Sequence, residues 1–322
     1  FSIDTLRNAT KRITHIPRVF ITVLQLQLGI VYFYAGLAKL NSDWLLEAMP
    51  LRIWLPAHTD LPLIGPLLDK RWIAYFFSWF GALYDLSIPF LLMFRKTRAL
   101  AYVCVVAFHL MTFFLFQIGM FPFIMIICTL IFFPENVHKR IIISIQKITG
   151  ASKFQTTLLP DKTYTFVPLS KRLLMSLCII HFVVQLLIPF RFVVYPGKLF
   201  WTEQGYRFSW RVMLMEKAGK AFFYVTDPVT KRSGETMMDN DLTVNQEKMM
   251  ATQPDMILQY AHYLKQKYQK QGIANPEIRV ECYVTLNGSG SRLFIDKTVD
   301  LTKEQESFKS KNWILPFKEN KK

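Results

Sequence analysis

The sequence has few cysteines, and it lacks the short motifs that identify the commonest enzyme classes. Four cysteines occur among 322 residues, and none has CxxC or metal-ligand spacing. Cys104, Cys128 and Cys178 lie inside apolar runs, so we expect buried free thiols, no structural disulfide and no metal site. No nucleophile motif, P-loop, GxGxxG or HExxH occurs. The usual signatures of nucleotide, dinucleotide and zinc-dependent chemistry are therefore missing.

Acidic residues are scarce relative to basic ones. The chain has 39 Lys and Arg against 23 Asp and Glu, a net charge of +16 and a pI near 9.7. In a soluble chain this excess would suggest a nucleic-acid partner. Here the basic residues lie mostly in short loops between apolar runs, and no basic stripe alternates with aromatics. We therefore expect no nucleic acid as a partner.

The sequence is rich in apolar residues. Hydrophobic residues make up 52% of the chain, with 28 phenylalanines, and they concentrate in the first 195 positions. This composition predicts an α-helical polytopic membrane domain at 1–193, followed by a small β-rich extracytoplasmic domain with one helix at 194–322. The lipid bilayer would then be a partner of the first domain.

Five apolar segments can be delimited in the first domain. They run over 19–38, 73–94, 100–116, 118–133 and 173–192. The first is about as long as a membrane crossing requires. The third and fourth nearly abut at Gln117–Pro122, where glycine and proline predict a hairpin or a re-entrant bend.

The basic clusters predict the orientation of these segments. If each segment spans once, three clusters fall on one side, which the positive-inside rule makes cytoplasmic. The clusters are Lys11, Arg12 and Arg18; Arg95, Lys96 and Arg98; and Lys139, Arg140, Lys147, Lys153, Lys162, Lys171 and Arg172. Lys39, the 41–71 loop and everything after Phe192 would then lie outside. Arg52, Lys70 and Arg71 on the outer loop weaken this assignment slightly.

The second domain has the patterns of a small sheet with one helix. A strand is expected at 222–228, and residues 254–270 have helical spacing with one apolar face. Alternation at 278–286 predicts a half-buried strand, and the Asn287–Gly290 turn leads into a returning strand at 292–296.

Lys39 is the most informative single residue, because it stands at the end of the first apolar segment. One interpretation is snorkelling, in which the ammonium reaches water at the headgroups. The other is an amine kept partly dry, since desolvation favours the neutral form that can act as a base. Position alone favours snorkelling.

Other polar residues inside the apolar segments also require explanation. His109 is either a neutral histidine bonded to a neighbouring helix or a residue near a ligand. Asp85 needs a hydrogen-bond donor, so it either pairs with a lysine or arginine or marks a cavity. Gln25, Gln27 and Gln117 are expected to bond between helices, and His181 with Gln185 is expected at a helix–helix contact.

Several motifs, in order along the chain, resemble the vitamin K-dependent gamma-glutamyl carboxylases. Residues 30–36, followed by Lys39-Leu40 and Asp43-Trp44, resemble the IVYFxAGxxKLxxDW segment of that family. His15-Ile16-Pro17 looks like its HVP, and residues 108–109 with 115–121 resemble its FHxxNxxLFxIGMF helix. Tyr206–Trp210, followed by Met213, is similar to its YGYSWxMM stretch. The resemblance extends from about residue 14 to 313, and it also fits the broader family of horizontally transferred transmembrane-domain (HTTM) proteins.

The resemblance implies a specific reaction. That family adds CO2 to the γ-carbon of protein glutamates, and it obtains the necessary strong base by oxygenating vitamin K hydroquinone to the epoxide. A lysine amine starts the process by deprotonating the hydroquinone, and by motif match that lysine would be Lys39. The expected co-substrates are O2 and CO2, with no metal. Given the family match, we favour the catalytic interpretation of Lys39.

The resemblance also implies further site residues. Tyr206, Ser209 and Trp210 would bind the substrate glutamate of a protein or peptide, while His109 and Asp43 would have supporting roles. Arg207 and Gly205 depart from the family pattern, so the choice of substrate is open. Charge and brevity look bacterial, which would place the protein in the inner membrane.

Two further expectations concern the limits of this sequence. The family has additional helices before the His15 motif, and the first residue is Phe1 rather than methionine, so we expect a truncated sequence that is inactive alone. Two other functions stay open: a membrane protein of the same fold that binds a quinone or lipid without carboxylation, and a membrane scaffold whose outer domain binds a partner.

Overall fold

The computed structural model describes residues 15–116, 118–150 and 163–318, together with Ile3, Arg7 and Ile13. The predictions that rest on Lys11, Arg12, Gln117, Lys153 and Lys162 lie outside these residues. The chain forms two compact units, each built from two separate stretches. Residues 1–37 and 81–187 make up the helical unit, and residues 38–80 and 188–322 make up the outer unit.

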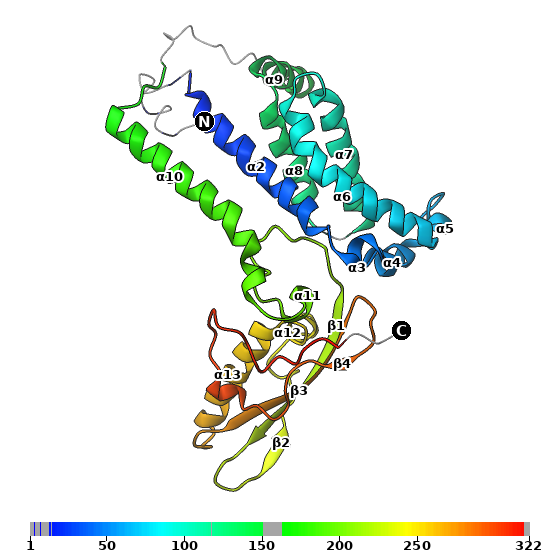
Figure 1. Ribbon diagram of the computed structural model, residues 1–322, viewed down its shortest axis with the longest axis vertical. Helices are drawn as coiled ribbons and strands as arrows, with labels where there is room; N and C mark the ends of the chain where they lie inside the picture. The colour runs from blue at the N-terminus through cyan, green and yellow to red at the C-terminus, as the bar shows by residue number, and fades with distance from the viewer. Residues whose placement is uncertain are drawn as a thin grey trace. The chain divides into compact units, whose positions relative to one another are not determined.

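Long apolar helices dominate the helical unit (Figure 1). Its helices are α2 (Arg18–Ala38), α6 (Arg71–Met93), α7 (Arg98–Leu115), α8 (Phe121–Thr129), α9 (Glu135–Thr149) and α10 (Pro168–Leu187), with the 3-10 helix η3 (Leu130–Phe132); the ends of α2 and α6 extend into the other unit. Among the described residues, four stretches are long and apolar enough to cross a membrane: α2, α6, α7 and the stretch 168–194.

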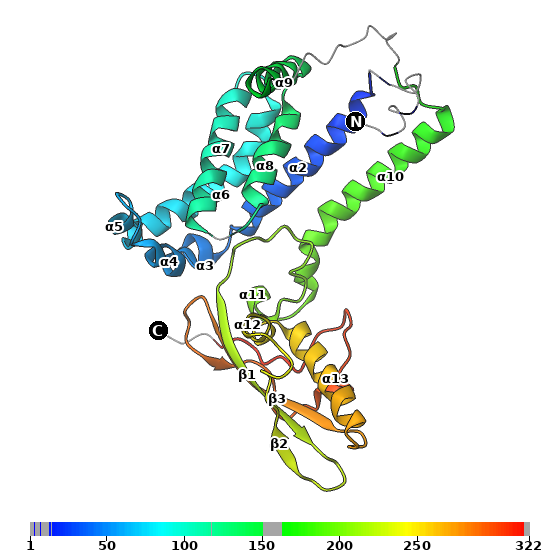
Figure 2. The same ribbon diagram turned by 180° about the vertical axis from the view of Figure 1, so that it is seen from behind.

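The fourth predicted segment is shorter than a membrane crossing. Residues 118–133 form α8 and η3, a helix of 121–132, rather than one long helix. At 1.5 Å per residue it is about 18 Å long, whereas the apolar core of a bilayer is about 30 Å thick. The helix starts late because Gly119 adopts a left-handed φ of 61° and Pro122 opens α8. The predicted hairpin is confirmed, since α7 and α8 pack against each other (Figure 2).

The core of the helical unit is aromatic and aliphatic. Tyr32, Tyr84, Ile88, Val105 and Met125 belong to one buried cluster contributed by α2, α6, α7 and α8. Because lipid tails are as apolar as these side chains, close van der Waals packing rather than removal from water stabilises the cluster. These helices therefore hold together through a continuous apolar core.

One close approach inside this unit requires a glycine. A Cβ added to Gly36 would lie 2.7 Å from the backbone nitrogen of Leu86. Real Cβ atoms do not come so close, so α2 and α6 pack at this point only because residue 36 has no side chain.

Polar side chains connect the helices of this unit as predicted. Gln25 donates to the carbonyl of Ile131 at 3.0 Å, and Gln27 bonds to His181 of α10 at 2.8 Å. Such bonds satisfy polar groups that lipid cannot. Asp85 is buried at 5% exposure, as expected for a carboxylate that must have partners.

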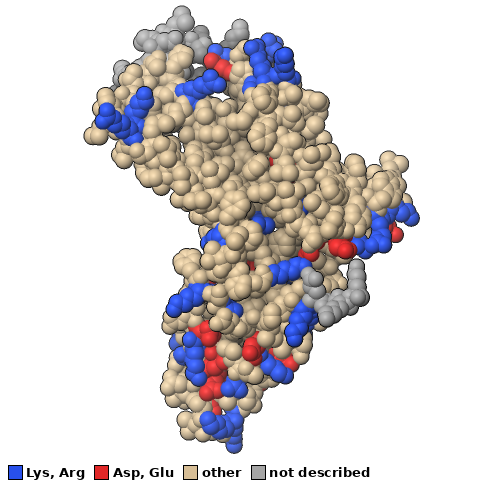
Figure 3. Space-filling model, in the orientation of Figure 1, with Lys and Arg blue, Asp and Glu red and all other residues tan. Residues whose placement is uncertain are grey.

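Helix α9 was not predicted from the sequence. It contains no buried residue and exposes four isoleucines, Ile142, Ile143, Ile145 and Ile148. Figure 3 shows Lys and Arg gathered at the end of the helical unit where α9 and the start of α10 lie, while the flanks of the long helices are almost uncharged. An exposed helix that is both apolar and basic is typical of a membrane surface.

An antiparallel sheet of four strands forms the centre of the outer unit. Its strands are β1 (Lys217–Thr226), β2 (Ser233–Glu235), β3 (Glu277–Leu286) and β4 (Arg292–Leu293), in the order β2-β1-β3-β4. The predicted strands at 222–228 and 278–286 are confirmed. β1 begins five residues earlier than expected, and β4 is shorter than the predicted 292–296.

The predicted helix is confirmed as α13 (Pro254–Lys270), which covers one face of this sheet. The register pairs Ala221 with Cys282 and Phe223 with Val280, and all four side chains are buried. The ring of Phe223 meets Tyr260 of α13 edge-on at 4.9 Å. Alternation on the strands and helical spacing on α13 therefore build one apolar core.

Several short helices complete the outer unit. Residues 38–80 contribute α3 (Ser42–Leu45), α4 (Leu51–Trp54), η2 (Leu55–His58) and α5 (Gly65–Leu68), where only a loop was expected. The later stretch adds η4 (Ile188–Val194), α11 (Leu199–Thr202), α12 (Val244–Met250) and η5 (Leu301–Lys303). Residues 38–80 thus belong to the same unit as the sheet domain, although more than 100 residues separate them in the sequence.

Candidate functional site

Lys39 is the first residue after α2, and it is buried at 8% exposure. Its Nζ lies 5.4 Å from the centre of the Trp44 ring. Trp44 is itself buried, and its indole nitrogen donates to the carbonyl of Ser78 at 2.8 Å. The predicted catalytic amine therefore lies against a fixed aromatic face rather than in open water.

The turn after Lys39 has a defined structure. Asn41 caps α3, because its side-chain oxygen accepts from the backbone N–H of Trp44 at 3.0 Å. The amide of the same side chain donates to the carbonyl of Ala38 at 2.9 Å. Asn41 thus joins the last turn of α2 to the first turn of α3, and Lys39 lies between them.

Asp43, predicted as a supporting residue, connects this turn to the sheet domain. Lys198 donates to one of its carboxylate oxygens at 3.0 Å, and the Asn287 amide donates to the other at 3.0 Å. The two partners lie 155 and 244 residues away in the sequence. The Asp43 side chain is 17% exposed, so these charge-assisted bonds are partly shielded from water.

The connection continues beyond Asp43. Asn287 accepts from the backbone N–H of Glu216 at 2.9 Å and donates its own N–H to the Glu216 carbonyl at 2.8 Å. Trp54 of α4 donates from its indole to the Glu216 carboxylate at 2.6 Å. We call Asp43, Lys198, Asn287, Glu216 and Trp54 the Asp43 network. It ties residues 38–80 to the start of β1 and the end of β3.

Tyr206, Ser209 and Trp210 lie in a second region, the irregular segment 203–213. Tyr206 donates to the carbonyl of Arg211 at 2.9 Å, and Ser209 donates to the carbonyl of Tyr206. Burial, followed by the charge of Glu203, raises the pKa of Tyr206 to about 12, so its hydroxyl stays protonated at neutral pH. The structure therefore brings two of the three predicted glutamate-binding residues into direct contact.

The backbone of segment 203–213 is strained. Four non-glycine residues have left-handed φ angles between 55° and 58°: Glu203, Phe208, Trp210 and Met213. Each such residue costs of order 1–3 kcal/mol and persists only where its surroundings impose it. Clustered strain of this kind is typical of functional sites rather than of ordinary loops.

Gly205 fixes this segment against η4. It has a φ of 79°, and a Cβ added there would lie 2.6 Å from the Cα of Phe192. The guanidinium of Arg211 also contacts Phe192, at 4.6 Å from the centre of its ring. Burial lowers the pKa of Arg211 below its usual value. The departure from the family pattern at residue 205 thus has a structural cause, because only glycine fits there.

Two buried donors in this segment have no hydrogen-bond partner among the described residues. They are the indole nitrogen of Trp210 and the Nε of Arg211. A buried unpartnered donor costs about 1–3 kcal/mol. A ligand with acceptor oxygens would remove that cost.

His109 lies in the helical unit. It is buried at 4% exposure, and its Nε2 is 3.1 Å from the Tyr32 hydroxyl, which also approaches Thr129 at 3.4 Å. Its Nδ1 has no partner among the described residues. The histidine therefore joins α7 to α2, and it retains one nitrogen for a further contact.

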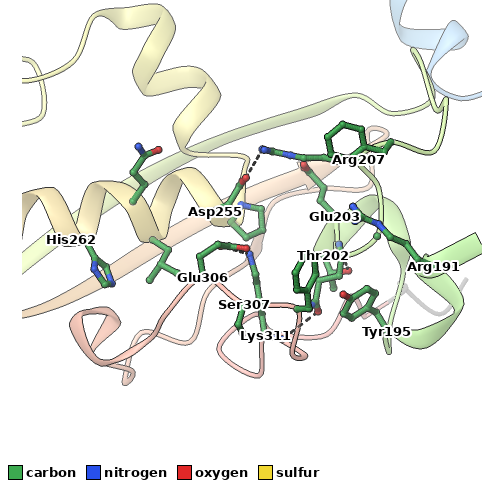
Figure 4. A pocket seen from close by; sticks show the side chains of 17 residues that line it. Arg191, Tyr195, Thr202, Glu203, Arg207, Asp255, His262, Glu306, Ser307 and Lys311 are labelled. Atoms are coloured by element: carbon green, nitrogen blue, oxygen red, sulfur yellow. Dashed lines mark hydrogen bonds and ion pairs between the residues drawn. The ribbon is translucent and has the colours of Figure 1, made fainter. Parts of the chain in front are cut away.

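A cavity of about 580 Å³ opens beside segment 203–213 in the outer unit (Figure 4). Gly205, Arg207 and Phe208 contribute to its wall, and so do Gln259 and His262 of α13. Its charged lining residues are Arg191, Glu203, Arg207, Asp255, Glu306 and Lys311. No reasoning from the sequence pointed to Arg191, Lys198 or Asn287, because no motif or spacing links them to the predicted site.

The candidate site is therefore divided among three places. Lys39 and Asp43 share the turn after α2, Tyr206, Ser209 and Trp210 share segment 203–213, and His109 belongs to the helical unit. Within the described parts of the chain, no group of three or more His, Cys, Asp or Glu side chains is arranged to hold a metal ion.

Comparison with known families accounts for both units. Residues 170–320 match the family described as vitamin K-dependent gamma-carboxylase, lumenal domain. Residues 1–136 match the HTTM domain. The chain belongs to the gamma-carboxylase family. No solved structure matches the chain.

The two matches agree with the architecture of this gamma-carboxylase family member. The HTTM match contains α2, α6, α7 and α8 together with Lys39 and Asp43, and the lumenal-domain match contains the whole sheet, segment 203–213 and the cavity. The apolar helices and the HTTM match together indicate an integral membrane protein.

Proposed function

We propose that the protein carboxylates the γ-carbon of protein glutamates and couples this reaction to oxidation of vitamin K hydroquinone to the epoxide, with Lys39 as the base. The observation that carries the proposal is the position of Lys39. Its amine is buried beside Trp44 at the end of an apolar helix, and Asp43 four residues later is bonded to the domain of the lumenal match.

Lys39 would remove a proton from the bound hydroquinone. To do so the amine must carry a free electron pair and lie within hydrogen-bond reach of the hydroquinone hydroxyl. When bound, the hydroquinone would supply, on reaction with O2, a base strong enough to remove the γ-proton of glutamate. The fixed ring of Trp44 limits the positions open to the amine, so the proton acceptor is held ready rather than found by diffusion.

Residues of segment 203–213 would bind the glutamate substrate. The Trp210 indole is a donor suited to carboxylate oxygens, whereas the hydroxyl hydrogens of Tyr206 and Ser209 already bond to the carbonyls of Arg211 and Tyr206. Tyr206 and Ser209 would therefore shape the segment that presents this donor. The unpartnered Trp210 nitrogen supports substrate binding, because it is buried without an acceptor of its own. Asp43 would position the turn that carries Lys39, and His109 would support the arrangement of the helices.

The orientation and location of the protein belong to the same proposal. We propose that Lys39 and the sheet domain lie on the extracytoplasmic side of a bacterial inner membrane. The support is the charge count, since the basic clusters precede or separate the apolar stretches on the opposite side.

A second candidate function is quinone or lipid binding without carboxylation. A shallow apolar groove of about 160 Å³ in the helical unit favours it. Gly29, Phe33 and Pro89 line this groove together with Leu186 of α10. Such a groove fits an apolar chain, and it would serve a carboxylase and a binding protein equally well. A scaffold role would need neither this groove nor a buried lysine.

One experiment separates the three functions. The full-length protein is purified in detergent and given vitamin K hydroquinone, O2, labelled bicarbonate and a glutamate-rich peptide. Label in the peptide that depends on hydroquinone supports the carboxylase. Epoxide or quinone binding without label would contradict carboxylation and support the second function. If hydroquinone neither reacts nor binds, the scaffold role is favoured.

A further inference from the structure

The acidic residues of the 580 Å³ cavity all have basic partners. Asp255 pairs with Arg207, and both line the cavity (Figure 4). Glu306 accepts from Lys311 at 2.8 Å, again within the lining. Glu203 pairs at 2.6 Å with a buried lysine of β1 that does not line the cavity. No carboxylate of the lining is therefore left without a cation.

Arg191 is the exception among the charged lining residues. Its Nε is buried and has no hydrogen-bond partner among the described residues, and no described acidic side chain forms an ion pair with it. Figure 4 shows Arg191 on the same side of the cavity as Glu203 and Tyr195. The cavity thus has three neutralised pairs and one uncompensated cation.

The end of an apolar stretch is a common place for an arginine that reaches for lipid headgroups or water. Residue 191 does fall within the apolar stretch 168–194. Only the Nε of Arg191 is buried; the side chain as a whole is partly exposed, and the residue lines the cavity. Its guanidinium can therefore meet a ligand in the cavity as well as water.

The rest of the lining suits a short peptide. Pro254, Leu258 and Phe308 provide apolar surface, and Gln259 and Ser307 provide neutral polar groups. Pro254 also begins α13, whose N-terminal end carries a partial positive charge. The volume falls within the range of about 300–1,000 Å³ that is usual for ligand sites.

We propose that this cavity binds an acidic segment of the peptide substrate, next to the glutamate that reacts, with Arg191 pairing with one of its carboxylates. An arginine guanidinium can form two parallel bonds to a carboxylate. Gly205, Arg207 and Phe208 line the cavity within the same segment as Tyr206 and Trp210, which makes the two sites continuous along the chain. This inference rests on the proposed function for the identity of the substrate.

A binding experiment without hydroquinone tests this inference separately from the reaction. The full chain in detergent is titrated with two labelled peptides that share one central glutamate. The flanking residues include glutamates in the first peptide and glutamines in the second. Fluorescence anisotropy should give a dissociation constant at least about tenfold lower for the first peptide.

Variants of Arg191 locate this selectivity. Arg191→Gln should abolish the preference for the acidic peptide, and Arg191→Lys should keep part of it, because the charge remains. Arg232→Gln is the matched control, since Arg232 is exposed in the hairpin between β1 and β2 and does not line the cavity. This control should bind both peptides like the parent protein.

Several results would overturn the inference. These are equal affinities for the two peptides, an unchanged preference in Arg191→Gln, or binding of phosphatidylglycerol that requires Arg191 while the peptide does not bind. If Arg191→Gln does not fold, Ser307→Trp provides the second test, because it fills the cavity from an exposed position and should weaken binding of the acidic peptide. Selective binding without carboxylation would leave the cavity assignment intact and contradict the proposed function instead.

Discussion

Two regions of the outer unit handle polar groups in opposite ways. In the Asp43 network both carboxylate oxygens of Asp43 are occupied, and Asn287 bonds to Asp43 and Glu216 at once. In segment 203–213, Trp210 and Arg211 bury donors that have no partner within the described chain, and four non-glycine residues have left-handed backbones. Both regions lie in the same unit and carry predicted site residues.

This difference distinguishes a region that fixes the position of its residues from a region that has donors free for a ligand. A fully bonded network holds its members in one arrangement, so it suits a turn that must present an amine in a constant position. Donors that are buried without acceptors cost stability in the empty protein, and a ligand with acceptor oxygens recovers that cost. Under the proposed function, the Asp43 network would position Lys39 and segment 203–213 would bind the substrate.

The largest expected effect on stability comes from the tightest contact of segment 203–213. Gly205→Ala would place a Cβ 2.6 Å from the Cα of Phe192 and force alanine into a φ of 79°. We expect a loss of roughly 2–5 kcal/mol, measured by thermal or denaturant unfolding of the purified protein. Gly290→Ala is the control, because its φ is 83° but no atom lies within 4 Å. Equal losses in the two variants would mean that the contact with Phe192 does not matter.

The Asp43 network predicts the next largest effect. Asn287→Ala should remove the bonds to Asp43 and Glu216 and destabilise the protein by roughly 2–3 kcal/mol. It should also lower kcat while the affinity for peptide stays unchanged, because the turn with Lys39 loses its support. Asn287→Gly serves as the control for the left-handed backbone at this position, where φ is 48°. A rise in KM with constant kcat would contradict a positioning role.

Substitution of Trp210 should have a smaller effect on stability and should change KM rather than kcat. Trp210→Phe removes the unpartnered indole nitrogen and keeps an aromatic ring. Stability should change by less than about 1 kcal/mol, while KM for the peptide should rise several-fold. Peptide kinetics and thermal unfolding on the same preparation measure both. A marked loss of stability with unchanged KM would show that the indole has only a structural role.

The smallest expected effect is on the pH dependence of stability, and it concerns Asp241, a carboxylate that lies outside both regions. Burial raises the pKa of Asp241, but hydrogen bonds from Lys267, Tyr263 and Tyr260 outweigh it and hold the pKa below the usual 3.8. Folding is therefore favoured by this group above about pH 4, and that contribution is lost as the pH falls through the lowered pKa. The melting temperature of Asp241→Asn should consequently fall less steeply on acidification than that of the parent. Parallel melting curves from pH 3 to 7 would test this, and identical slopes would contradict it.

Helices and strands could be predicted from the sequence wherever a single hydrophobic pattern dominated a segment. Apolar runs placed α2, α6 and α7, and alternation placed β1 and β3, because burial on one side leaves a periodic trace in the sequence. Helix α9 and the short helices of 38–80 left no such trace, since α9 buries no residue and the others span only four residues each. Their formation depends on local capping and on tertiary contacts.

Individual residues of the candidate site could be predicted from the sequence, but their contacts with one another could not. Lys39 and Asp43 could be singled out by their motif, yet nothing in the sequence joined Asp43 to Lys198 or Asn287 across 155 and 244 residues. The same holds for Arg191, because an uncompensated charge becomes visible only when the pairing of every neighbouring carboxylate is known. Long-range pairing is a property of the folded chain.

The most direct test of the account is the loss of the Lys39 amine. Epoxide formation and fixation of labelled CO2 are measured side by side for the parent protein and Lys39→Ala, with thermal unfolding as the check of folding. The account predicts that both products fall by roughly 10²–10⁴-fold in the variant while the melting temperature and peptide affinity stay close to those of the parent. A folded Lys39→Ala protein that still forms epoxide and fixes CO2 at the parent rate would contradict the central claim.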